Sequence, residues 1–252
     1  MSYSPSSKLD YEKVNKHIVS WLKNKILSAG KKGGVFGLSG GLDSTVTAAL
    51  LKQAFPKSSL GVILPCESSE EDIEDAYLAA DNIGLKVKEV ELDGVFQDLL
   101  SRLKEAEPGD EKLAEANIKP RLRMTALYYI AARRDALVVG TGNWSELTTG
   151  YFTKYGDSGV DIAPLGRLAK TEVRELGRYL DVPDKILGRK PSAGLWEGQT
   201  DESELGLSYE KLDKYILTGN ADDEVQEKVE ELKESNRHKL KFPPAPDRED
   251  LI

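Results

Sequence analysis

The chain has very few of the residues that form disulfides or histidine-rich metal centres. Among its 252 residues there is one cysteine, Cys66, and there are two histidines, His17 and His238. One thiol excludes an intrachain disulfide, a Cys-x-x-Cys zinc site and a dithiol redox pair. Two histidines are too few for a metal centre built from several imidazoles. This thiol usage favours a reducing, cytoplasmic location.

Long apolar runs and excess positive charge are also missing. No hydrophobic stretch approaches the ~20 residues that a helix needs to cross a bilayer, and the polar residues 1–10 carry no signal-peptide core. The formal net charge of −8 argues against a protein that binds the phosphate backbone of DNA or RNA. With 31% charged and 39% hydrophobic residues, the composition is that of a soluble globular protein. We therefore expect one domain, residues 1–252, with neither membrane nor nucleic acid as partner.

Two common phosphate-binding patterns are absent as well. A Walker loop requires G-x-x-x-x-G-K-[ST], and no Gly-Lys pair stands in that frame. The nearest match to the dinucleotide fingerprint G-x-G-x-x-G starts at Gly140 and ends on Ser145, where glycine is required. Any nucleotide site must therefore be built on another loop.

The string Ser39-Gly40-Gly41-Leu42-Asp43-Ser44 supplies such a loop. It follows the apolar residues 35–38 and precedes the largely apolar residues 45–51, so a strand is predicted to run into a glycine turn that opens a helix. That turn aims main-chain N–H groups and the positive end of the helix dipole at one spot. Gly40 and Gly41 let the main chain approach an anion without a Cβ in the way.

Three side chains in this string have the chemistry of a magnesium–nucleotide site. Ser39 and Ser44 supply hydroxyl donors, and Asp43 supplies a carboxylate. A carboxylate beside a phosphate site is useful when a Mg²⁺ ion lies between them, because Mg²⁺ takes oxygen ligands. The string resembles the pyrophosphate loop of the ATP pyrophosphatases, which split ATP between the α- and β-phosphates. The alternative interpretation is a tight turn capped by serine and aspartate.

Apolar strand-like segments alternate with amphipathic helical ones along the chain. Strands are predicted at residues 34–38, 60–64, 87–92 and 136–139. Helices are predicted directly after Ser44 and at residues 11–27, 69–84, 95–103, 121–134, 171–180 and 222–234. This alternation is typical of a doubly wound α/β fold, a mostly parallel sheet with helices on both faces. Because ligands gather at the carboxyl ends of such strands, the loop at 39–44 and Thr141 are expected to share one cleft.

Two later segments, residues 151–165 and 191–206, are rich in Gly, Asp, Ser and Thr and lack a clear period. Long irregular segments in compact proteins usually form functional loops or lids. They contain or adjoin the strings Tyr151-Phe152-Thr153-Lys154-Tyr155-Gly156-Asp157 and Lys190-Pro191-Ser192-Ala193-Gly194-Leu195-Trp196. With the loop at 39–44 and residues 117–124, 140–146 and 161–172, these strings resemble the ammonia-dependent NAD⁺ synthetases over nearly the whole chain.

The resemblance implies a ligase that amidates deamido-NAD⁺. The nicotinate carboxylate attacks the α-phosphorus of ATP, pyrophosphate leaves, and ammonia then attacks the acyl-adenylate to give NAD⁺ and AMP. A carboxylate is a poor electrophile, and adenylylation provides it with a good leaving group. The resemblance also implies an adenine nucleotide alpha-hydrolase-like fold, Mg²⁺ as cofactor and a homodimer.

The same resemblance assigns roles to individual residues. Asp43 and Glu146 match the magnesium ligands, and Lys170 matches a fixed cation for the departing pyrophosphate; these three are the expected catalytic residues. The implied ATP site comprises Gly37, Leu38, Ser39, Gly40, Gly41, Leu42, Asp43, Ser44, Thr141, Lys170 and Ser192. The implied deamido-NAD⁺ site comprises Arg121, Lys154, Asp161, His238 and Lys239. Since no protein nucleophile is needed, catalysis would consist of positioning and electrostatics.

Three positions depart from the family pattern. Ser158 stands where many members have glycine, so a positive φ there would make this loop differ. Ser192 replaces a common threonine and keeps its hydroxyl. The Cys66-Glu67-Ser68-Ser69 string replaces the aromatic or histidine and glycine that often follow the second strand. Adenine contacts from that loop are therefore not carried over.

Two other functions remain open at this point. Glutamine-dependent relatives, GMP synthetase and asparagine synthetase add a glutaminase domain, for which this chain has no room, so free ammonia is expected unless a separate subunit supplies it. The tRNA-thiolating relatives usually need cysteine pairs and a basic surface, and the sequence has neither. A nucleotide sensor without chemistry would keep the loop at 39–44 but has no reason to keep Glu146, Lys154 and Lys170 together.

Overall fold

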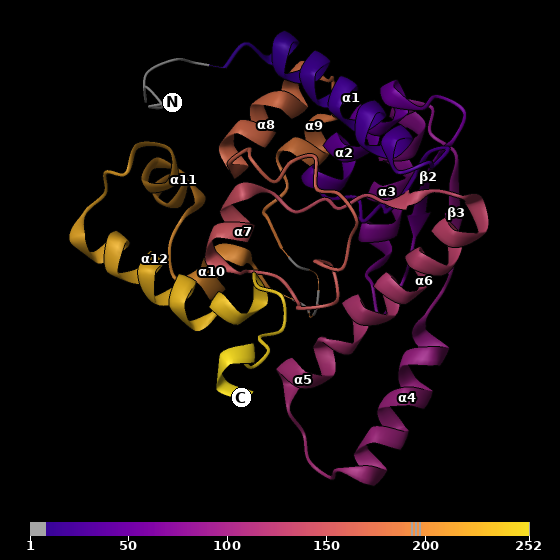
Figure 1. The fold of residues 1–252 in the computed structure, drawn as a ribbon. Helices are drawn as coiled ribbons and strands as arrows, with labels where there is room; N and C mark the ends of the chain where they lie inside the picture. Colours follow the sequence, from indigo (N-terminus) through magenta and orange to yellow (C-terminus); the bar gives the residue numbers. More distant parts are fainter. Residues whose placement is uncertain (1–8, 193, 195, 197, 252) are drawn as a thin grey trace.

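The fold is built on a parallel β-sheet, seen in a computed structural model that describes residues 9–192, 194, 196 and 198–251. Its four strands are β1 (Gly34–Gly37), β2 (Ser59–Ile63), β3 (Val87–Glu89) and β4 (Leu137–Val138). They lie in the order β3-β2-β1-β4 (Figure 1), and every pairing between them is parallel. The predicted α/β fold is confirmed, with β3 and β4 shorter than the sequence pattern indicated.

The central strand β1 contributes to two different cores. Val35 pairs with Leu60 of β2 and with Val138 of β4, and all three belong to the core on one face of the sheet. Phe36, the next residue, is fully buried in the core on the opposite face. Because successive strand residues point to opposite faces, a strand covered on both sides shows the continuous apolar run found at residues 35–38.

Helices cover both faces of the sheet (Figure 1). One face carries α1 (Tyr11–Ser28), α2 (Leu42–Ala54), α3 (Glu70–Ile83), α8 (Lys170–Tyr179) and α9 (Asp184–Leu187). The other face carries α4 (Asp93–Ala106) and α6 (Ile118–Arg134). Phe36 belongs to the core under the first set of helices, and Val35 belongs to the core under the second set. The sheet is therefore buried on both faces, as in other doubly wound folds.

Helix ends follow local signals where the sequence has them. α3 begins at the predicted capping box, in which Ser69 accepts from the amide of Asp72 and the Asp72 carboxylate accepts from the amide of Ser69. It ends at Gly84, whose φ is +63°. α6 begins three residues before the predicted start, because Pro120 lies in the first turn, where its missing amide has no helical partner to lose.

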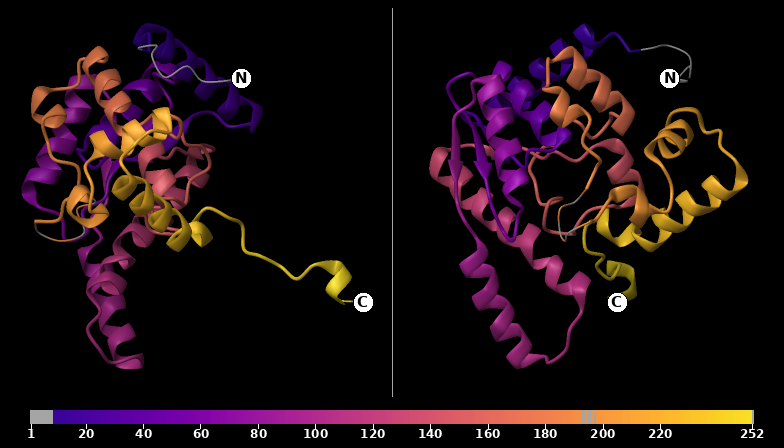
Figure 2. Two further views of the ribbon diagram at one scale, coloured as in Figure 1. Left: turned by 90° about the vertical axis from the view of Figure 1, so that its left-hand side faces the viewer. Right: turned by 180° about the vertical axis from the view of Figure 1, so that it is seen from behind.

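Residues 201–235 form a smaller helical cluster beside the sheet (Figure 2). It consists of α10 (Asp201–Leu205), α11 (Tyr209–Thr218) and α12 (Asp223–Ser235). These helices bury Leu205, Leu212 and Val229 against one another. The expectation of an irregular segment over 191–206 was wrong for α10, and α11 was not predicted, because helices of one to three turns carry little periodicity.

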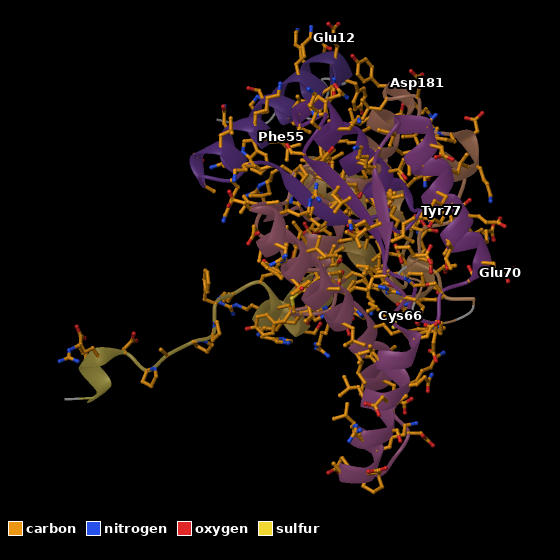
Figure 3. All side chains as sticks on the ribbon, turned by 90° about the vertical axis from the view of Figure 1, so that its right-hand side faces the viewer. Glu12, Phe55, Cys66, Glu70, Tyr77 and Asp181 are labelled. Atoms are coloured by element: carbon orange, nitrogen blue, oxygen red, sulfur yellow. The ribbon has the colours of Figure 1, made fainter. Side chains whose placement is uncertain are left out.

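An arm made of α4 and α5 (Lys112–Ala116) extends from the body of the molecule (Figures 1 and 3). Cys66 lies where this arm meets the body (Figure 3) and is fully buried, as a small apolar residue can be. The remaining elements are α7 (Trp144–Thr149), η1 (Arg237–Lys239) and η2 (Arg248–Leu251). Within the described ranges no helix combines the length and the hydrophobicity needed to cross a bilayer.

The strand order creates a crevice at the carboxyl edge of the sheet. From β1 the chain crosses to β2 and β3 on one side, whereas β4 lies on the other side of β1. The loops that leave β1 and β4 therefore diverge, and residues 38–41 and 139–143 border the same crevice. Val139 also forms a parallel bridge with Ile162, which brings the segment around residue 162 alongside β4.

Candidate functional site

The loop after β1 depends on a glycine for two separate reasons. Gly40 has a φ of +78°, and a Cβ built there would lie 2.7 Å from the Cβ of Asp75 and from the amide nitrogen of Ala76 in α3. The left-handed backbone and the lack of space each require glycine. The loop is thus held against α3 and continues into Gly41, the N-cap of α2.

The first turn of α2 presents main-chain amides that are not used inside the protein. Gly41 caps the helix with no side-chain hydrogen bond. Among the amides of residues 39–45, all of which the structure describes, those of Gly40, Leu42, Asp43 and Ser44 have no acceptor. The hydroxyls of Ser39 and Ser44 lie 3.1 Å apart beside them. Unused amides at a helix N-terminus bind anions, so this turn has the form predicted for a phosphate loop.

Lys170, the first residue of α8, lies between two carboxylates from other segments. Its ammonium forms a short ion pair with Oδ2 of Asp43 and lies 3.4 Å from Oε1 of Glu146. Asp43 belongs to α2 and Glu146 to α7, and Lys170 follows Asp43 by 127 residues. Only 6% of the lysine side chain is exposed, so its charge is compensated by these carboxylates rather than by water.

Asn143 ties the two carboxylates together. As the N-cap of α7 it accepts from the amide of Glu146 (3.0 Å), while its own amide donates to Oε2 of Glu146 (3.1 Å). Its side-chain Nδ2 donates to Oδ1 of Asp43 at 3.2 Å. Asn143 was not among the predicted site residues, although an asparagine three residues before a glutamate is a capping signal.

Burial and charge set the protonation of this cluster. Burial raises the pKa of Glu146 well above the usual carboxyl range; Lys170 counteracts this, and Asp43 adds to it. Burial lowers the pKa of Lys170, but attraction to Asp43 and Glu146 outweighs burial and raises the pKa overall. The lysine is therefore a permanent cation at neutral pH, able to stabilise negative charge beside the free amides of α2.

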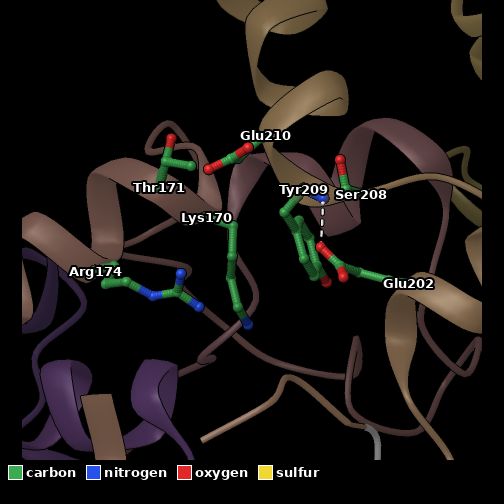
Figure 4. Close-up of a pocket in the computed structure, with 7 residues that line it drawn as sticks. All are labelled: Lys170, Thr171, Arg174, Glu202, Ser208, Tyr209 and Glu210. Atoms are coloured by element: carbon green, nitrogen blue, oxygen red, sulfur yellow. Dashed lines mark hydrogen bonds between the residues drawn. The ribbon is translucent and has the colours of Figure 1, made fainter. Parts of the chain in front are cut away.

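The helical cluster closes the site behind Lys170. The ring of Tyr209 lies 5.2 Å from the Lys170 ammonium, and its hydroxyl donates to Asp201 at 2.9 Å. Figure 4 shows Lys170 and Tyr209 side by side. Both residues line a cavity of about 270 Å³. The cavity is lined by Lys170, Thr171, Arg174, Glu202, Ser208, Tyr209 and Glu210. Burial raises the pKa of both Asp201 and Tyr209.

Four of the five residues predicted to bind the dinucleotide meet around the loop after α7. Arg121 donates to the carbonyl of Lys154 at 3.3 Å, and Lys154 Nζ donates to the carbonyl of His238 at 2.8 Å. The ammonium of Lys239 donates to two carbonyls of the turn at 150–152, at 2.8 and 3.0 Å. These cations thus join α6, the loop and η1, and all their acceptors are main-chain carbonyls.

Asp161 lies apart from this group. Its Oδ2 accepts from the amide of Val138 at 2.7 Å, and its Oδ1 accepts from the hydroxyl of Tyr128 at 3.0 Å. Tyr128 follows Arg121 by seven residues, which is roughly 10 Å along α6. Burial raises the pKa of Tyr128 to about 12, so the phenol remains a donor to Asp161.

The loop at 150–158 accommodates the serine that replaces a family glycine. Among the described residues other than glycine, a positive φ in this loop occurs at Tyr155 (+60°) and not at Ser158. The hydroxyl of Ser158 donates to the carbonyl of Thr153 at 3.0 Å. Ser158 therefore adds a hydrogen bond and does not strain the backbone.

Thr141 and Ser192 border the site without touching the phosphate loop. Thr141 precedes Asn143 by two residues in the loop after β4, and Ser192 accepts from the amide of Gly194 at 3.1 Å. Within the described residues no hydrogen bond joins either of them to residues 37–44. The structure does not bring them together with the loop as it does Asp43, Glu146 and Lys170.

The loop after β2 is fixed by two cations of α6. Arg123 donates to the carbonyl of Leu64 at 3.0 Å and to the hydroxyl of Ser68 at 3.2 Å. Lys119 pairs with Glu67 at 2.7 Å. This role was not predicted, because residues 117–124 entered the prediction only as part of the family resemblance and the partner loop lies more than fifty residues away.

With this geometry established, comparison with known proteins identifies the family. A model of the NAD synthase family matches residues 14–243. The chain belongs to this family. The NH₃-dependent NAD⁺ synthetase of Carboxydothermus hydrogenoformans is 51% identical over 240 residues, which are 95% of this chain and 99% of that protein. The NAD synthetase resemblance stated from the sequence motifs is confirmed.

Solved structures support the same assignment. An NMN synthetase from Francisella tularensis superposes with a TM-score of 0.90 at 33% identity, over 95% of this chain and 100% of that one. An NH₃-dependent NAD synthetase from Campylobacter jejuni superposes with a TM-score of 0.77 at 27% identity, over 95% and 100%. Asp43, Glu146 and Lys170 all lie inside the region matched by the NAD synthase family model.

Proposed function

We propose that this member of the NAD synthase family is an ammonia-dependent ligase that converts deamido-NAD⁺, ATP and ammonia into NAD⁺, AMP and pyrophosphate. The observation that carries the proposal is Lys170 held between Asp43 and Glu146 beside the unused amides of α2. An anion site, a fixed cation and a carboxylate pair meet where α/β sheets bind ligands. A nucleotide sensor needs the amides but has no use for a lysine buried between two carboxylates.

The phosphate loop would hold the leaving pyrophosphate. The amides of Gly40, Leu42, Asp43 and Ser44 and the Lys170 ammonium offer it hydrogen bonds and positive charge. A nicotinate carboxylate oxygen attacks the α-phosphorus of ATP, and the bond from that phosphorus to the pyrophosphate oxygen breaks. The resulting acyl-adenylate keeps the attacking oxygen between carbon and phosphorus. This chemistry needs no nucleophile from the protein, so the chain would contribute positioning and charge stabilisation.

The donor set fits a magnesium ion. Asp43 and Glu146 already share one cation, the ammonium of Lys170, so the pair is arranged to hold positive charge. The described residues hold no group of three or more His, Cys, Asp or Glu side chains placed to bind a metal. Mg²⁺ commonly takes one or two carboxylates and completes its shell with phosphate oxygens and water. When bound, it would neutralise charge that grows on the departing pyrophosphate.

The cations around the loop at 150–158 would bind the dinucleotide. Arg121, Lys154 and Lys239 suit a ligand with a pyrophosphate and a carboxylate, and the carbonyl of His238 accepts from Lys154. Their present acceptors are main-chain carbonyls, which phosphate oxygens of the ligand would replace. Asp161 would contact the ligand from the edge of β4, apart from these cations.

Free ammonia is the proposed nitrogen source for a single synthetase domain at residues 1–252. The ammonia lone pair attacks the acyl carbon, the bond from that carbon to the AMP oxygen breaks, and the nitrogen loses one proton to water, which yields the amide. Only uncharged NH₃ has that lone pair, so the rate at fixed total ammonium is expected to rise with pH near neutrality. Glutamine is not expected to replace ammonium.

Amidation of nicotinate mononucleotide is a second candidate. It is favoured by the TM-score of 0.90 and the 33% identity to an NMN synthetase. Both substrates carry the same nicotinate carboxylate, so the proposed chemistry at Asp43, Glu146 and Lys170 would be unchanged. They differ only in the adenylate half, which the cations at Arg121, Lys154 and Lys239 would recognise.

We also propose a homodimer that works in the cytoplasm. Tyr129 on α6 is 69% exposed, and the hydroxyl of the neighbouring Tyr128 donates a hydrogen bond to Asp161. A second copy covering this face would bury the tyrosine and lie next to the proposed dinucleotide site. The lone buried Cys66 is compatible with a reducing compartment. Light scattering of the protein in solution tests the dimer.

Product analysis tests the proposed function. The protein is mixed with ATP, Mg²⁺ and ammonium, with deamido-NAD⁺, nicotinate mononucleotide or neither. AMP and pyrophosphate that form only with deamido-NAD⁺ support the first proposal, and a higher kcat/KM for the mononucleotide supports the second. Absence of AMP with both carboxylates, while ATP still binds, would favour the sensor.

A further inference from the structure

α8 begins without the side chain that normally caps a helix. Its N-cap is Ala169, which has no hydrogen-bonding side chain, and the first two residues of the helix are Lys170 and Thr171. The amides of a first turn have no acceptor within the helix, and a serine, threonine, aspartate or asparagine at the N-cap usually provides one. Glu172 accepts from the amide of Ala169 at 2.9 Å, but it provides no acceptor for the amides of Lys170 and Thr171.

A carboxylate from α11 takes over this function. Oδ2 of Asp213 accepts from the amide of Thr171 at 2.7 Å. Its Oδ1 accepts from the hydroxyl of Ser145 on α7. The Oγ of Ser145 in turn accepts from the amide of Lys170 at 3.0 Å. Asp213 is 1% exposed and Ser145 is fully buried, so water does not compete for these bonds.

The same bonds join the two helices that carry the reactive cluster. Ser145 immediately precedes Glu146 on α7, and Lys170 opens α8. Asp213 therefore fixes the main chain of Ser145, next to Glu146, and the main chain at Lys170. It does so from α11, which forms no hydrogen bond with the side chain of Glu146 or Lys170 among the described residues. A misplacement of about 1 Å in such a group can lower a rate by about 100-fold.

We propose that Asp213 is a positioning residue that sets the main chain of Lys170 and Glu146 through Ser145 and the first turn of α8. This inference rests on the proposed function of the two side chains. It assigns to the α10–α12 cluster a task in catalysis beyond its own packing.

The test compares Asp213→Ala and Asp213→Asn with Val229→Ala. Val229 is fully buried in the same cluster, so its truncation destabilises the cluster without touching the hydrogen bonds of Asp213. At a temperature where all variants are folded, Asp213→Ala is expected to lower kcat by about 10- to 100-fold. Asp213→Asn keeps an oxygen for the amide of Thr171 and should recover most of that loss. Val229→Ala should stay within about twofold of wild type.

A second readout does not require turnover. The rate at which a small acylating reagent labels Lys170, measured by mass spectrometry without nucleotide, reports how firmly its ammonium is held against Asp43. We expect at least about fivefold faster labelling in Asp213→Ala and an unchanged rate in Val229→Ala. Equal labelling and equal kcat in these two variants would overturn the positioning role. An inactive wild type that still shows the labelling difference would contradict the proposed function and leave the positioning role standing.

Discussion

The side chains proposed to hold ATP and those proposed to hold the dinucleotide differ in what they contact. Lys170 meets the carboxylates of Asp43 and Glu146, so charges of opposite sign are paired inside the protein. Lys154 and Lys239, by contrast, donate to main-chain carbonyls. The first cluster pairs its charges in ion pairs, whereas the hydrogen bonds of Lys154 and Lys239 go to neutral acceptors.

This difference indicates how each side would respond to its ligand. A cluster with paired charges is stable before the nucleotide binds, and a magnesium ion can take over the role of the lysine. Cations bonded only to carbonyls attract an anionic ligand and can exchange a neutral acceptor for a charged one, which is the stronger hydrogen bond. We therefore expect substitutions in the first cluster to act on turnover and stability, and those in the second to act on affinity.

The largest effect is expected for Asp43→Asn. It weakens the proposed metal ligand and removes the charge that Lys170 faces, so turnover should fall by about 100- to 1,000-fold, and the protein should be less stable than wild type but still folded. The rate of AMP release at saturating Mg²⁺ measures this fall in turnover. Asp135→Asn is the matched control, because that carboxylate pairs with Lys31 at 3.1 Å far from the crevice. A near-normal rate at saturating Mg²⁺ would remove Asp43 from the site.

Lys170→Met tests whether the lysine compensates the carboxylates in the ligand-free protein. Breaking a buried ion pair by removing one partner typically costs about 3–5 kcal/mol, so the urea midpoint should fall. Added Mg²⁺ should restore more stability in this variant than in wild type, since it can replace the missing cation. The exposed pair Lys228–Glu231 provides the control Lys228→Met. A variant as stable as wild type and indifferent to Mg²⁺ would contradict the compensation.

Lys154→Met tests the dinucleotide side. Loss of one charge-assisted hydrogen bond, about 1.5–3 kcal/mol, should raise the KM for the dinucleotide by about 10- to 100-fold. The KM for ATP should change by less than about threefold, because the lysine contacts His238 and not the phosphate loop. Steady-state kinetics with each substrate varied in turn separates the two constants. Equal increases in both would place Lys154 elsewhere.

The pH dependence of stability isolates Glu146. Burial raises its pKa, so the folded protein binds this proton more tightly than the unfolded chain does. The stability it contributes is present below the unfolded pKa and is lost as pH rises through the folded one, between about pH 5 and pH 8. Glu146→Gln should flatten this decline in urea titrations without ligand. An unchanged slope would show that the carboxyl titrates at its ordinary pKa.

The smallest effect is expected for Ser158→Gly, which restores the common family residue. It removes the hydrogen bond from Ser158 to Thr153, worth about 1 kcal/mol, and relieves no backbone strain. Kinetic constants should stay within about twofold of wild type. A large gain in affinity for the dinucleotide would mean that the serine distorts the loop after all.

Sequence patterns predicted the parts of this molecule that are built from neighbouring residues. The strand, glycine turn and helix around Gly40 were predicted because each signal lies within a few residues of the next, and the capping box at Ser69 was found for the same reason. Asp43, Glu146 and Lys170 were selected by family resemblance, and the structure brings all three together.

Contacts between distant segments had no such signal. The bond from Ser145 to Asp213 spans 68 residues, and nothing near Ala169 shows that its missing cap is supplied by α11. The separation of Asp161 from the cations around Lys154 likewise depends on where β4 ends relative to α6. Such placements follow from packing of the whole chain rather than from any local pattern.

The most direct test of the central claim follows one oxygen atom. Deamido-NAD⁺ labelled with ¹⁸O in its nicotinate carboxylate is incubated with ATP, Mg²⁺, ammonium and the protein, and the products are examined by mass spectrometry. Attack on the α-phosphorus in the crevice beside Asp43, Glu146 and Lys170 predicts one ¹⁸O atom in AMP and none in pyrophosphate. Label in pyrophosphate or phosphate, or its release to water with unlabelled AMP, would contradict this account.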